Sequence, residues 1–169
     1  VTDETKTQAI QTVLIVEDDA SQRRTLTDIL EAEGFHVASF ASASQAMLSP
    51  VWSKAHVAIV DLRLPDLDER SLLDKLRSIS ETVPVIVHTA FGSYQSAKDS
   101  VNVGAFAYLE KGGDPGGLIR CVHRAVAAGY RRRAEGLEEL AAKRTRELEN
   151  VNAALQRKIV QHRQAEEEV

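Results

Sequence analysis

The chain has 169 residues, of which 43% are hydrophobic and 27% are charged, and its formal net charge is -4. This length suffices for one ordinary domain and an appendage, and the composition is typical of a globular protein. The slightly acidic charge argues against nucleic-acid binding through a basic surface. A single cysteine excludes an internal disulfide and a cysteine-based metal cluster, and the sequence contains no run of about 18 apolar residues that could span a membrane.

The first twelve residues are polar and lack the apolar core of a secretory signal, so they are predicted to form a flexible leader. The chain begins with Val1 instead of methionine, and we expect a processed or shortened form of a longer protein. The single Cys121 fits a reducing compartment, and we expect the protein to be cytoplasmic.

From residue 13 onward, short apolar runs alternate with segments that have helical spacing. The apolar runs predict buried strands at residues 13–16, 35–40, 57–60, 83–88 and 106–109. The spacing of leucines, together with capping residues, predicts helices at residues 20–33, 43–48, 71–79 and 93–103 and a further helix that starts near Asp114 and Pro115.

Strands and helices therefore alternate five times, and the predicted strands are apolar on both faces. These two features predict an α/β protein with a doubly wound parallel sheet that is covered by helices on both sides. Ligands of such sheets bind at the carboxyl ends of the strands, near the point where the strand order reverses. Polar residues at these ends are therefore candidate site residues.

The strand ends carry acidic groups together with a lysine and a threonine. Glu17 and Asp18 follow the first strand, Asp61 follows the third, Thr89 follows the fourth and Lys111 lies just beyond the fifth. Two carboxylates about 4 Å apart repel by ~4 kcal/mol at an effective dielectric constant of ~20, so a hard divalent cation such as Mg²⁺ is expected to offset the repulsion. A carboxylate nucleophile, a metal, a lysine and a hydroxyl together predict a phosphoryl-transfer site. A dinucleotide site is disfavoured, because the sequence EDD replaces the glycine-rich loop after the first strand.

Four stretches, VLIVEDD, IVDLRLPD, VIVHTA and GAFAYLEK, carry a resemblance to a known family. Residues 13–128, about two-thirds of the chain, resemble the receiver domain of bacterial two-component response regulators. The resemblance implies a flavodoxin-like five-stranded sheet in the order 2-1-3-4-5. It also implies that Asp61 accepts a phosphoryl group from a phosphohistidine on a sensor histidine kinase or a phosphotransfer protein.

The same resemblance implies a role for each polar residue of the site. Mg²⁺ would be held by Asp18, Asp61 and the backbone carbonyl of Arg63, with help from Glu17. The phosphoryl oxygens would be bound by Thr89 and Lys111, which are the catalytic residues.

Tyr108 falls at the position of the family's switch aromatic, whose ring turns inward when the threonine, here Thr89, moves toward the phosphate. A half-buried tyrosine at a strand end is an equally good interpretation from the sequence alone.

The sequence departs from the family pattern at two places near the site, and two further residues occupy positions where the family varies. Glycine follows Lys111 where the family has proline in a cis peptide; because a cis bond before a residue other than proline costs ~2.5–4 kcal/mol, we expect a trans bond or a looser loop. Glu69 stands where the family often has glycine. Arg63 and Phe91 flank the site at positions that tune the lifetime of the phosphate.

Residues 129–169 contain mostly good helix formers and lack proline, which predicts an extended C-terminal helix. Its candidate dimer seam consists of Leu137, Leu140, Leu148, Val151 and Leu155. The pair Leu148 and Val151 follows the pair Leu137 and Leu140 at an offset of eleven residues. Eleven is seven plus four, so the pattern is interpreted as heptads with one stutter. His162 and Val169 continue the seven-residue spacing after Leu155. A solvated, frayed helix is the alternative, but a helix of this length without a core needs a partner. We expect a coiled-coil linker in a parallel homodimer, and it resembles helices that lead from receivers into PAS, histidine-kinase or cyclase modules.

The predicted function is therefore a phosphoacceptor domain that signals through its C-terminal helix to an output module. It would catalyse its own phosphorylation and dephosphorylation without conventional turnover, and it would contact neither nucleic acid nor membrane directly. Two alternatives remain open. One is a receiver-like scaffold that signals without phosphorylation. The other is an Asp-nucleophile phosphatase of the haloacid-dehalogenase type, which is disfavoured because Arg63 stands where that type has an acidic proton donor.

Overall fold

The computed structural model describes residues 10–68, 71–72, 74–75, 78, 83–90 and 104–167. These residues belong to two compact units, one that ends at Tyr130 and one that begins at Arg131. Several sequence predictions lie wholly or partly outside the described residues: residues 1–9 of the predicted leader 1–12, the helix 93–103, four of the nine residues of the helix 71–79, and the positions Glu69, Phe91 and Val169.

The first unit is built on one parallel sheet of five strands. The strands are β1 (Thr12–Val16), β2 (His36–Phe40), β3 (Val57–Val60), β4 (Val85–Thr89) and β5 (Ala107–Glu110). Their spatial order is β2-β1-β3-β4-β5, and every neighbouring pair is parallel. This order and the α/β class confirm the sequence prediction.

The fourth strand starts two residues later than predicted. Pro84 has no amide hydrogen to donate to the ladder, although its carbonyl oxygen accepts a hydrogen bond from the Ala58 amide at 3.0 Å. Pairing with β3 therefore begins at Val85, and the strand continues one residue further, to Thr89. The predicted bounds 83–88 are therefore wrong at both ends, by two residues at the start and by one at the end.

The helices with described bounds are α1 (Ala20–Ala32), α2 (Ala43–Leu48) and α5 (Pro115–Glu167), with one 3-10 turn at Pro50–Ser53. The described residues 71–72, 74–75 and 78 are also helical, as predicted for residues 71–79. The 3-10 turn was not predicted, whereas the helix start near Asp114 and Pro115 is confirmed. Each of the first two helices begins with a side-chain cap: Asp19 accepts a hydrogen bond from the Gln22 amide, and Ser42 accepts one from the Gln45 amide. Residue Gly34, with φ at +88°, provides the left-handed conformation that ends α1.

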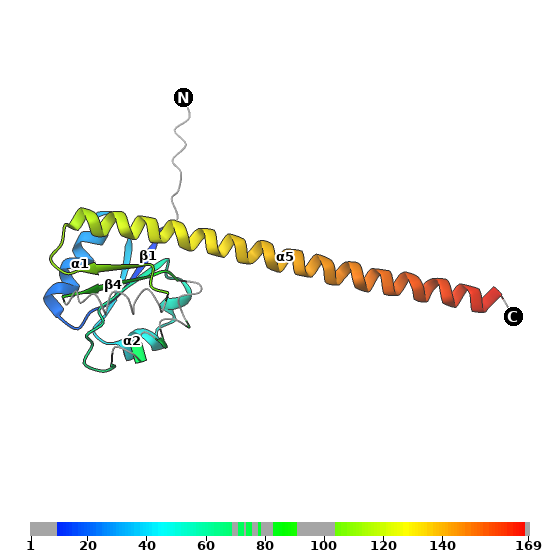
Figure 1. The fold of residues 1–169 in the computed structure, drawn as a ribbon, viewed down its shortest axis with the longest axis horizontal. Helices are drawn as coiled ribbons and strands as arrows, with labels where there is room; N and C mark the ends of the chain where they lie inside the picture. The colour runs from blue at the N-terminus through cyan, green and yellow to red at the C-terminus, as the bar shows by residue number, and fades with distance from the viewer. Residues whose placement is uncertain are drawn as a thin grey trace, which may run out of the picture. The chain divides into compact units, whose positions relative to one another are not determined.

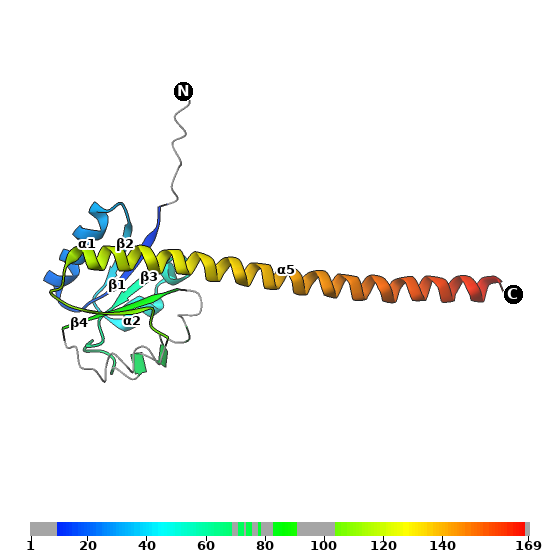
Figure 2. The same cartoon turned by 45° about the horizontal axis from the view of Figure 1, so that its top comes forward.

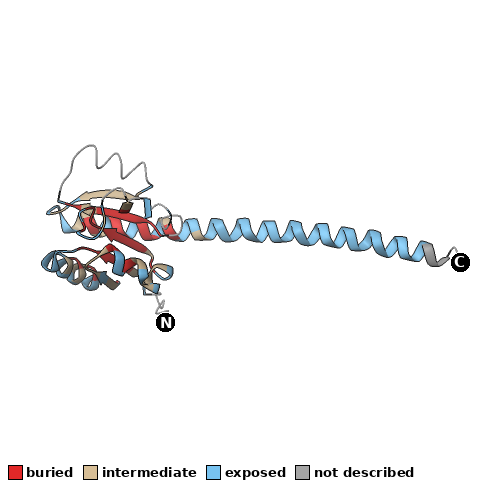
Figure 3. Cartoon of the chain, turned by 90° about the horizontal axis from the view of Figure 1, so that it is seen from below, coloured by how far each residue is buried: buried red, intermediate tan, exposed pale blue. Residues whose placement is uncertain are grey.

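Two apolar layers form the core, one on each face of the sheet. Helix α1 and the first turns of α5 cover one face, and α2 lies on the other (Figures 1 and 2). Successive residues of β1 serve opposite layers: Leu14 packs toward α2, and Ile15 packs toward α1. The central strands β1, β3 and β4 are largely buried for this reason (Figure 3), and this explains their continuous apolar sequence. The edge strands β2 and β5 are only partly buried.

The second unit consists of the remainder of α5, whose residues from Arg131 onward are nearly all exposed (Figure 3). The exposed residues include large apolar side chains, namely Leu137, Leu140, Leu148, Val151, Leu155, Ile159 and Val160. None of the helices among the described residues combines the length and apolar character that crossing a bilayer requires.

Replacing Gly129 with alanine is expected to destabilise the first unit. A Cβ atom there would lie 3.1 Å from Cδ of Pro84 and 3.3 Å from the carbonyl oxygen of His56, and neither a proline ring nor a backbone oxygen can move away easily. Overpacking of ~1–3 kcal/mol exceeds the ~1 kcal/mol gained in helix propensity. We expect Gly129→Ala to lower the melting temperature by a few degrees, measured by circular dichroism. Gly136→Ala, which meets nothing within 4 Å, is the control and should not lower it. An increase in the melting temperature of the Gly129 variant would contradict this packing.

Candidate functional site

The first acidic residues of the site follow directly from β1. The amide of Glu17 donates to the carbonyl oxygen of Phe40 at 3.0 Å, so the sheet pairing still holds the backbone at this residue. Its side chain is carried into the interior and is 1% exposed. The next residue, Asp18, is exposed, and Asp19 caps α1. The chain thus leaves the sheet with one carboxylate buried and the next at the surface.

Asp61 occupies the equivalent position at the end of β3. Its amide donates to the carbonyl oxygen of Val16 at 3.0 Å, and its side chain is also buried. Carboxylate oxygen Oδ1 accepts a hydrogen bond from the amide of Arg63 at 3.1 Å. Because an unpaired buried charge is costly, this carboxylate requires partners, and its second oxygen has one.

That partner is Lys111, which reaches in from the end of β5. Its ammonium nitrogen Nζ lies 2.6 Å from Oδ2 of Asp61 and 2.7 Å from Oε2 of Glu17. The Lys111 amide donates to the carbonyl oxygen of Thr89 at 2.9 Å, which fixes the start of the following loop against β4. The peptide bond to Gly112 is trans, as expected, and Gly112 adopts φ of +81°, a left-handed conformation that favours glycine.

Burial and charge act in opposite directions on the pKa values of Glu17 and Lys111. Burial raises the pKa of Glu17, and the nearby Asp61 charge adds to this effect, so the hydrogen bond from Lys111 offsets the shift only in part. Burial alone would lower the pKa of Lys111, but its hydrogen bonds to Asp61 and Glu17 prevail, and its pKa is raised. The ammonium is therefore held in its charged form, whereas burial works against the charged form of Glu17.

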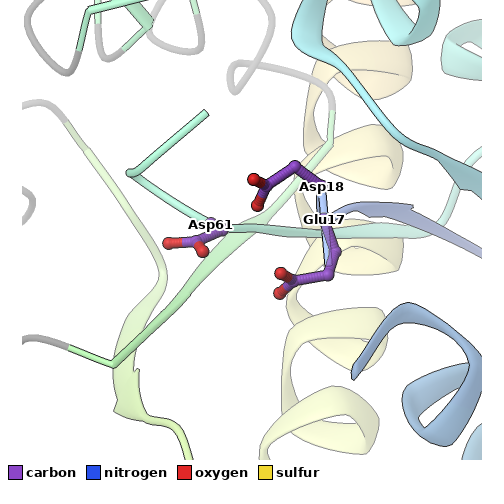
Figure 4. A group of neighbouring side chains, drawn as sticks. All are labelled: Glu17, Asp18 and Asp61. Atoms are coloured by element: carbon purple, nitrogen blue, oxygen red, sulfur yellow. The ribbon is translucent and has the colours of Figure 1, made fainter. Parts of the chain in front are cut away.

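The arrangement of the carboxylates fits a divalent cation. Glu17, Asp18 and Asp61 each place an oxygen within 4.8 Å of the others, and Figure 4 shows their side chains converging from the ends of β1 and β3. All three donors are hard oxygen ligands, which suit Mg²⁺. Since Asp18 is exposed, a bound ion could keep several waters, as Mg²⁺ usually does. The expected ligand role of the Arg63 carbonyl stays a prediction.

The two residues of the expected switch lie on one face of the sheet. Thr89 ends β4 and is 2% exposed. Tyr108 pairs with Val87, and both pack against the apolar layer on the α2 side. Because side chains alternate along a strand, Thr89 shares this face with Val87. The structure thus brings the threonine and the aromatic residue to neighbouring positions, and their roles in switching stay predictions.

One residue that supports the site was missed from the sequence. The guanidinium of Arg23, on α1, donates from Nη1 to the carbonyl oxygens of Glu17 at 2.7 Å and Asp18 at 3.1 Å. It thereby fixes the backbone that carries both carboxylates, and we regard it as a positioning residue. Spacing from the helix start could have suggested that Arg23 faces the loop, but backbone oxygens leave no mark in the sequence.

A cavity of about 750 Å³ lies beside the site, between α1 and the start of α5. Its walls include Leu26, Ile29, Leu109 and Leu118, and His88 and Lys111 also reach it. The Nδ1 atom of His88 is buried without a hydrogen-bond partner, and burial lowers the pKa of this histidine. The sequence prediction did not include this cavity, because its walls come from three distant segments.

Comparison with known proteins identifies the family. Residues 13–123 match the family described as the response regulator receiver domain. The chain is 31% identical over 125 residues to the C4-dicarboxylate transport transcriptional regulatory protein DctD of Rhizobium meliloti. It is 32% identical over 114 residues to the DNA-binding transcriptional regulator NtrC of Proteus hauseri. The matched regions cover 74% and 68% of this chain but 26% and 24% of those proteins, so the chain spans about a quarter of the length of these relatives.

Solved structures show the same fold. The signal receiver domain of a putative LuxO repressor protein from Vibrio parahaemolyticus is 27% identical, with a TM-score of 0.66, over 78% of this chain and 98% of that one. A chain from the CheX–CheY–BeF3–Mg²⁺ complex of Borrelia burgdorferi is 25% identical, with a TM-score of 0.61, over 66% of this chain and 86% of that one. Together with the family match over residues 13–123, these likenesses show that the chain belongs to the response regulator receiver domain family.

Proposed function

We propose that Asp61 is the phosphoacceptor of this receiver domain and that its donor is a phosphohistidine on a sensor histidine kinase or a phosphotransfer protein. The observation that carries the proposal is the position of the Asp61 carboxylate, which is buried, lies 2.6 Å from Lys111 Nζ and is within 4.8 Å of oxygens from Glu17 and Asp18. A nucleophilic carboxylate next to a fixed cation and a candidate metal site meets the requirements of phosphoryl transfer.

In the proposed reaction, a carboxylate oxygen of Asp61 forms a bond to phosphorus while the bond from phosphorus to the imidazole nitrogen of the donor breaks. The electron pair of that bond stays on the donor imidazole. Glu17, Asp18 and Asp61 would hold Mg²⁺, which would supply charge neutralisation for the phosphoryl oxygens. The ammonium of Lys111 and the hydroxyl of Thr89 bind the same oxygens, so the protein contributes positioning and charge neutralisation.

The proposed output follows from Thr89 and Tyr108, which lie on the same face of the sheet. Movement of the threonine toward the phosphoryl group would open space into which the ring could turn. We propose that this change is transmitted through α5 to an output module. The relatives DctD and NtrC are named as transcriptional regulators, so an output that acts on transcription is one candidate. We propose no direct contact of this chain with nucleic acid, and we propose a cytoplasmic location, which the free, buried Cys121 supports.

Two other functions receive less support from the site. A receiver-like scaffold that signals without phosphorylation would have no need for a buried carboxylate paired with Lys111. An Asp-nucleophile phosphatase needs an acidic proton donor two residues after Asp61, and exposed Arg63 stands there.

The proposed domain division is a receiver at residues 13–128 and a linker helix at residues 129–169, and we propose that the linker forms a parallel homodimer. The proposed seam consists of Leu137, Leu140, Leu148, Val151 and Leu155, each more than half exposed in the single chain. Full burial of such a side chain is worth about 1.5–3 kcal/mol. Because these side chains are only 51–67% exposed, ten of them in two copies would contribute about 8–20 kcal/mol, which is comparable to the roughly 4–15 kcal/mol that association costs.

The first prediction concerns Asp61. Incubation with acetyl phosphate and Mg²⁺ should add one phosphoryl group to the chain, measured by intact-protein mass spectrometry, and Asp61→Asn should abolish this gain because an amide is not a nucleophile. Asp28→Asn, the same change at an exposed position on α1, is the control and should be labelled as the parent is. Equal labelling of the Asp61 variant would refute the assignment.

The second prediction concerns the metal. Millimolar Mg²⁺ should raise the melting temperature, because it relieves the repulsion among the carboxylates and binds the folded state. In the Asp18→Asn variant, which lacks one ligand charge, the increase should fall to a small fraction of the parent value, as measured by differential scanning fluorimetry. Asp28→Asn again serves as the control. A melting temperature that does not respond to Mg²⁺ in the parent would contradict the site.

The third prediction concerns the dimer. Sedimentation equilibrium at tens of micromolar should show a dimer for the full chain. A chain that ends at Tyr130, where the first compact unit ends, should sediment as a monomer because it lacks the seam. The dimer proposal fails if the full chain is monomeric, and α5 is not the dimerising element if the shortened chain dimerises equally well.

A further inference from the structure

The exposed apolar residues of α5 follow a more regular pattern than a heptad with one stutter. Leu137, Leu148 and Ile159 are spaced eleven residues apart, and Leu140 and Val151 have the same spacing. All five lie in α5 and are about half or more exposed, from 47% for Ile159 to 67% for Leu137. Because eleven residues complete three turns at ~3.67 residues per turn, these positions form two neighbouring rows along one side of the helix.

We infer that α5 binds a second copy of this chain, parallel and in register, along a seam that repeats every eleven residues and includes Ile159. This inference rests on the proposed homodimer and specifies its contact surface. Both interpretations share Leu148, Val151 and Leu155, the last of which stands eleven residues after Arg144. They differ at the next seam position. Continued heptads place Lys158 in the seam, whereas the eleven-residue repeat places its neighbour Ile159 there.

The eleven-residue interpretation places the more suitable side chain in the seam at the position where the two interpretations differ. It buries an isoleucine, while the heptad interpretation buries a lysine and leaves the isoleucine outside. It also includes Leu137 and Leu140 without the stutter that a heptad pattern requires, since they stand one eleven-residue repeat before Leu148 and Val151. A seam of this period drifts about 20° per repeat around the helix, in the sense opposite to a heptad seam, so the two helices would wind weakly in the right-handed direction.

A second copy is the partner that best fits this surface. Its rows have the same spacing by identity, and in a parallel, in-register pair each seam residue meets its own counterpart across a two-fold axis. The basic and acidic residues on the rest of this helix nearly cancel, so two copies do not repel each other as a whole. A membrane surface fits less well, because it would select a predominantly basic polar face.

Arg144 lies in the seam between Leu140 and Leu148, where a charged side chain interrupts the apolar rows. Its Nη1 atom is 3.9 Å from Oε2 of Glu147 on the same helix. Such an exposed pair contributes little, but it can turn the guanidinium toward the edge of the seam. The repeat thus has its weakest layer near Arg144, with apolar layers on both sides of it.

Cysteine crosslinking in the full chain tests the repeat. Single substitutions Leu148→Cys, Lys158→Cys, Ile159→Cys and Val160→Cys would be oxidised and analysed on non-reducing gels. The parent sets the background, because its single thiol, Cys121, is buried and burial raises the pKa of that thiol. We expect the variants at 148 and 159 to crosslink several-fold faster than those at 158 and 160. Crosslinking at 158 but not at 159 would establish the heptad instead, and equal rates at 158, 159 and 160 would exclude a defined seam.

A pair of neighbouring substitutions provides a second, independent measurement. Ile159 and Val160 are 47% and 52% exposed in the single chain, so replacing either with glutamine removes a similar apolar surface. Ile159→Gln should weaken dimerisation several-fold in sedimentation equilibrium, and Val160→Gln should leave it near the parent value. If the parent is itself a monomer and position 148 does not crosslink, then the proposed homodimer fails. If the dimer forms and both glutamine variants behave alike, only the eleven-residue repeat fails.

Discussion

The ion pairs of Lys111 hold the functional edge of the sheet together. One ammonium group lies 2.7 Å from a Glu17 oxygen and 2.6 Å from an Asp61 oxygen, and it thereby connects the ends of β1, β3 and β5. Without it, two buried carboxylates would face each other unpaired, which the protein interior strongly disfavours. Three carboxylates against one ammonium leave a formal excess of negative charge, which favours a divalent cation at this edge of the sheet.

Much of the first unit could be predicted because the buried strands of a parallel sheet have a recognisable, continuously apolar sequence. Runs such as VLIV and VAIV, apolar on both faces, mark central strands, and the polar residues that follow them must meet at one edge. This reasoning predicts that Glu17, Asp18, Asp61, Thr89 and Lys111 lie at that edge. It was less successful at boundaries, as at Pro84, where a missing amide hydrogen moved the start of β4.

Other features could not be predicted because they depend on backbone atoms or on segments brought together only by folding. The contact of Arg23 with two carbonyl oxygens involves groups that every residue has. The cavity beside Lys111 is lined from α1, β5 and the start of α5, and no local pattern encodes its shape. Along α5 the reason is different, because both a seven-residue and an eleven-residue period fit the few leucines. The exposed Ile159 fits only the eleven-residue period.

The end of β4 gives the site a connection to both layers of the molecule. Thr89 shares a face with Tyr108 on the α2 side, while its neighbour His88 reaches the cavity between α1 and α5. A single peptide unit therefore joins two side chains that point into separate compartments. A displacement of that peptide unit would change the packing on both faces of the sheet at once. Phosphorylation of Asp61, as proposed, could therefore alter two opposite surfaces of the domain.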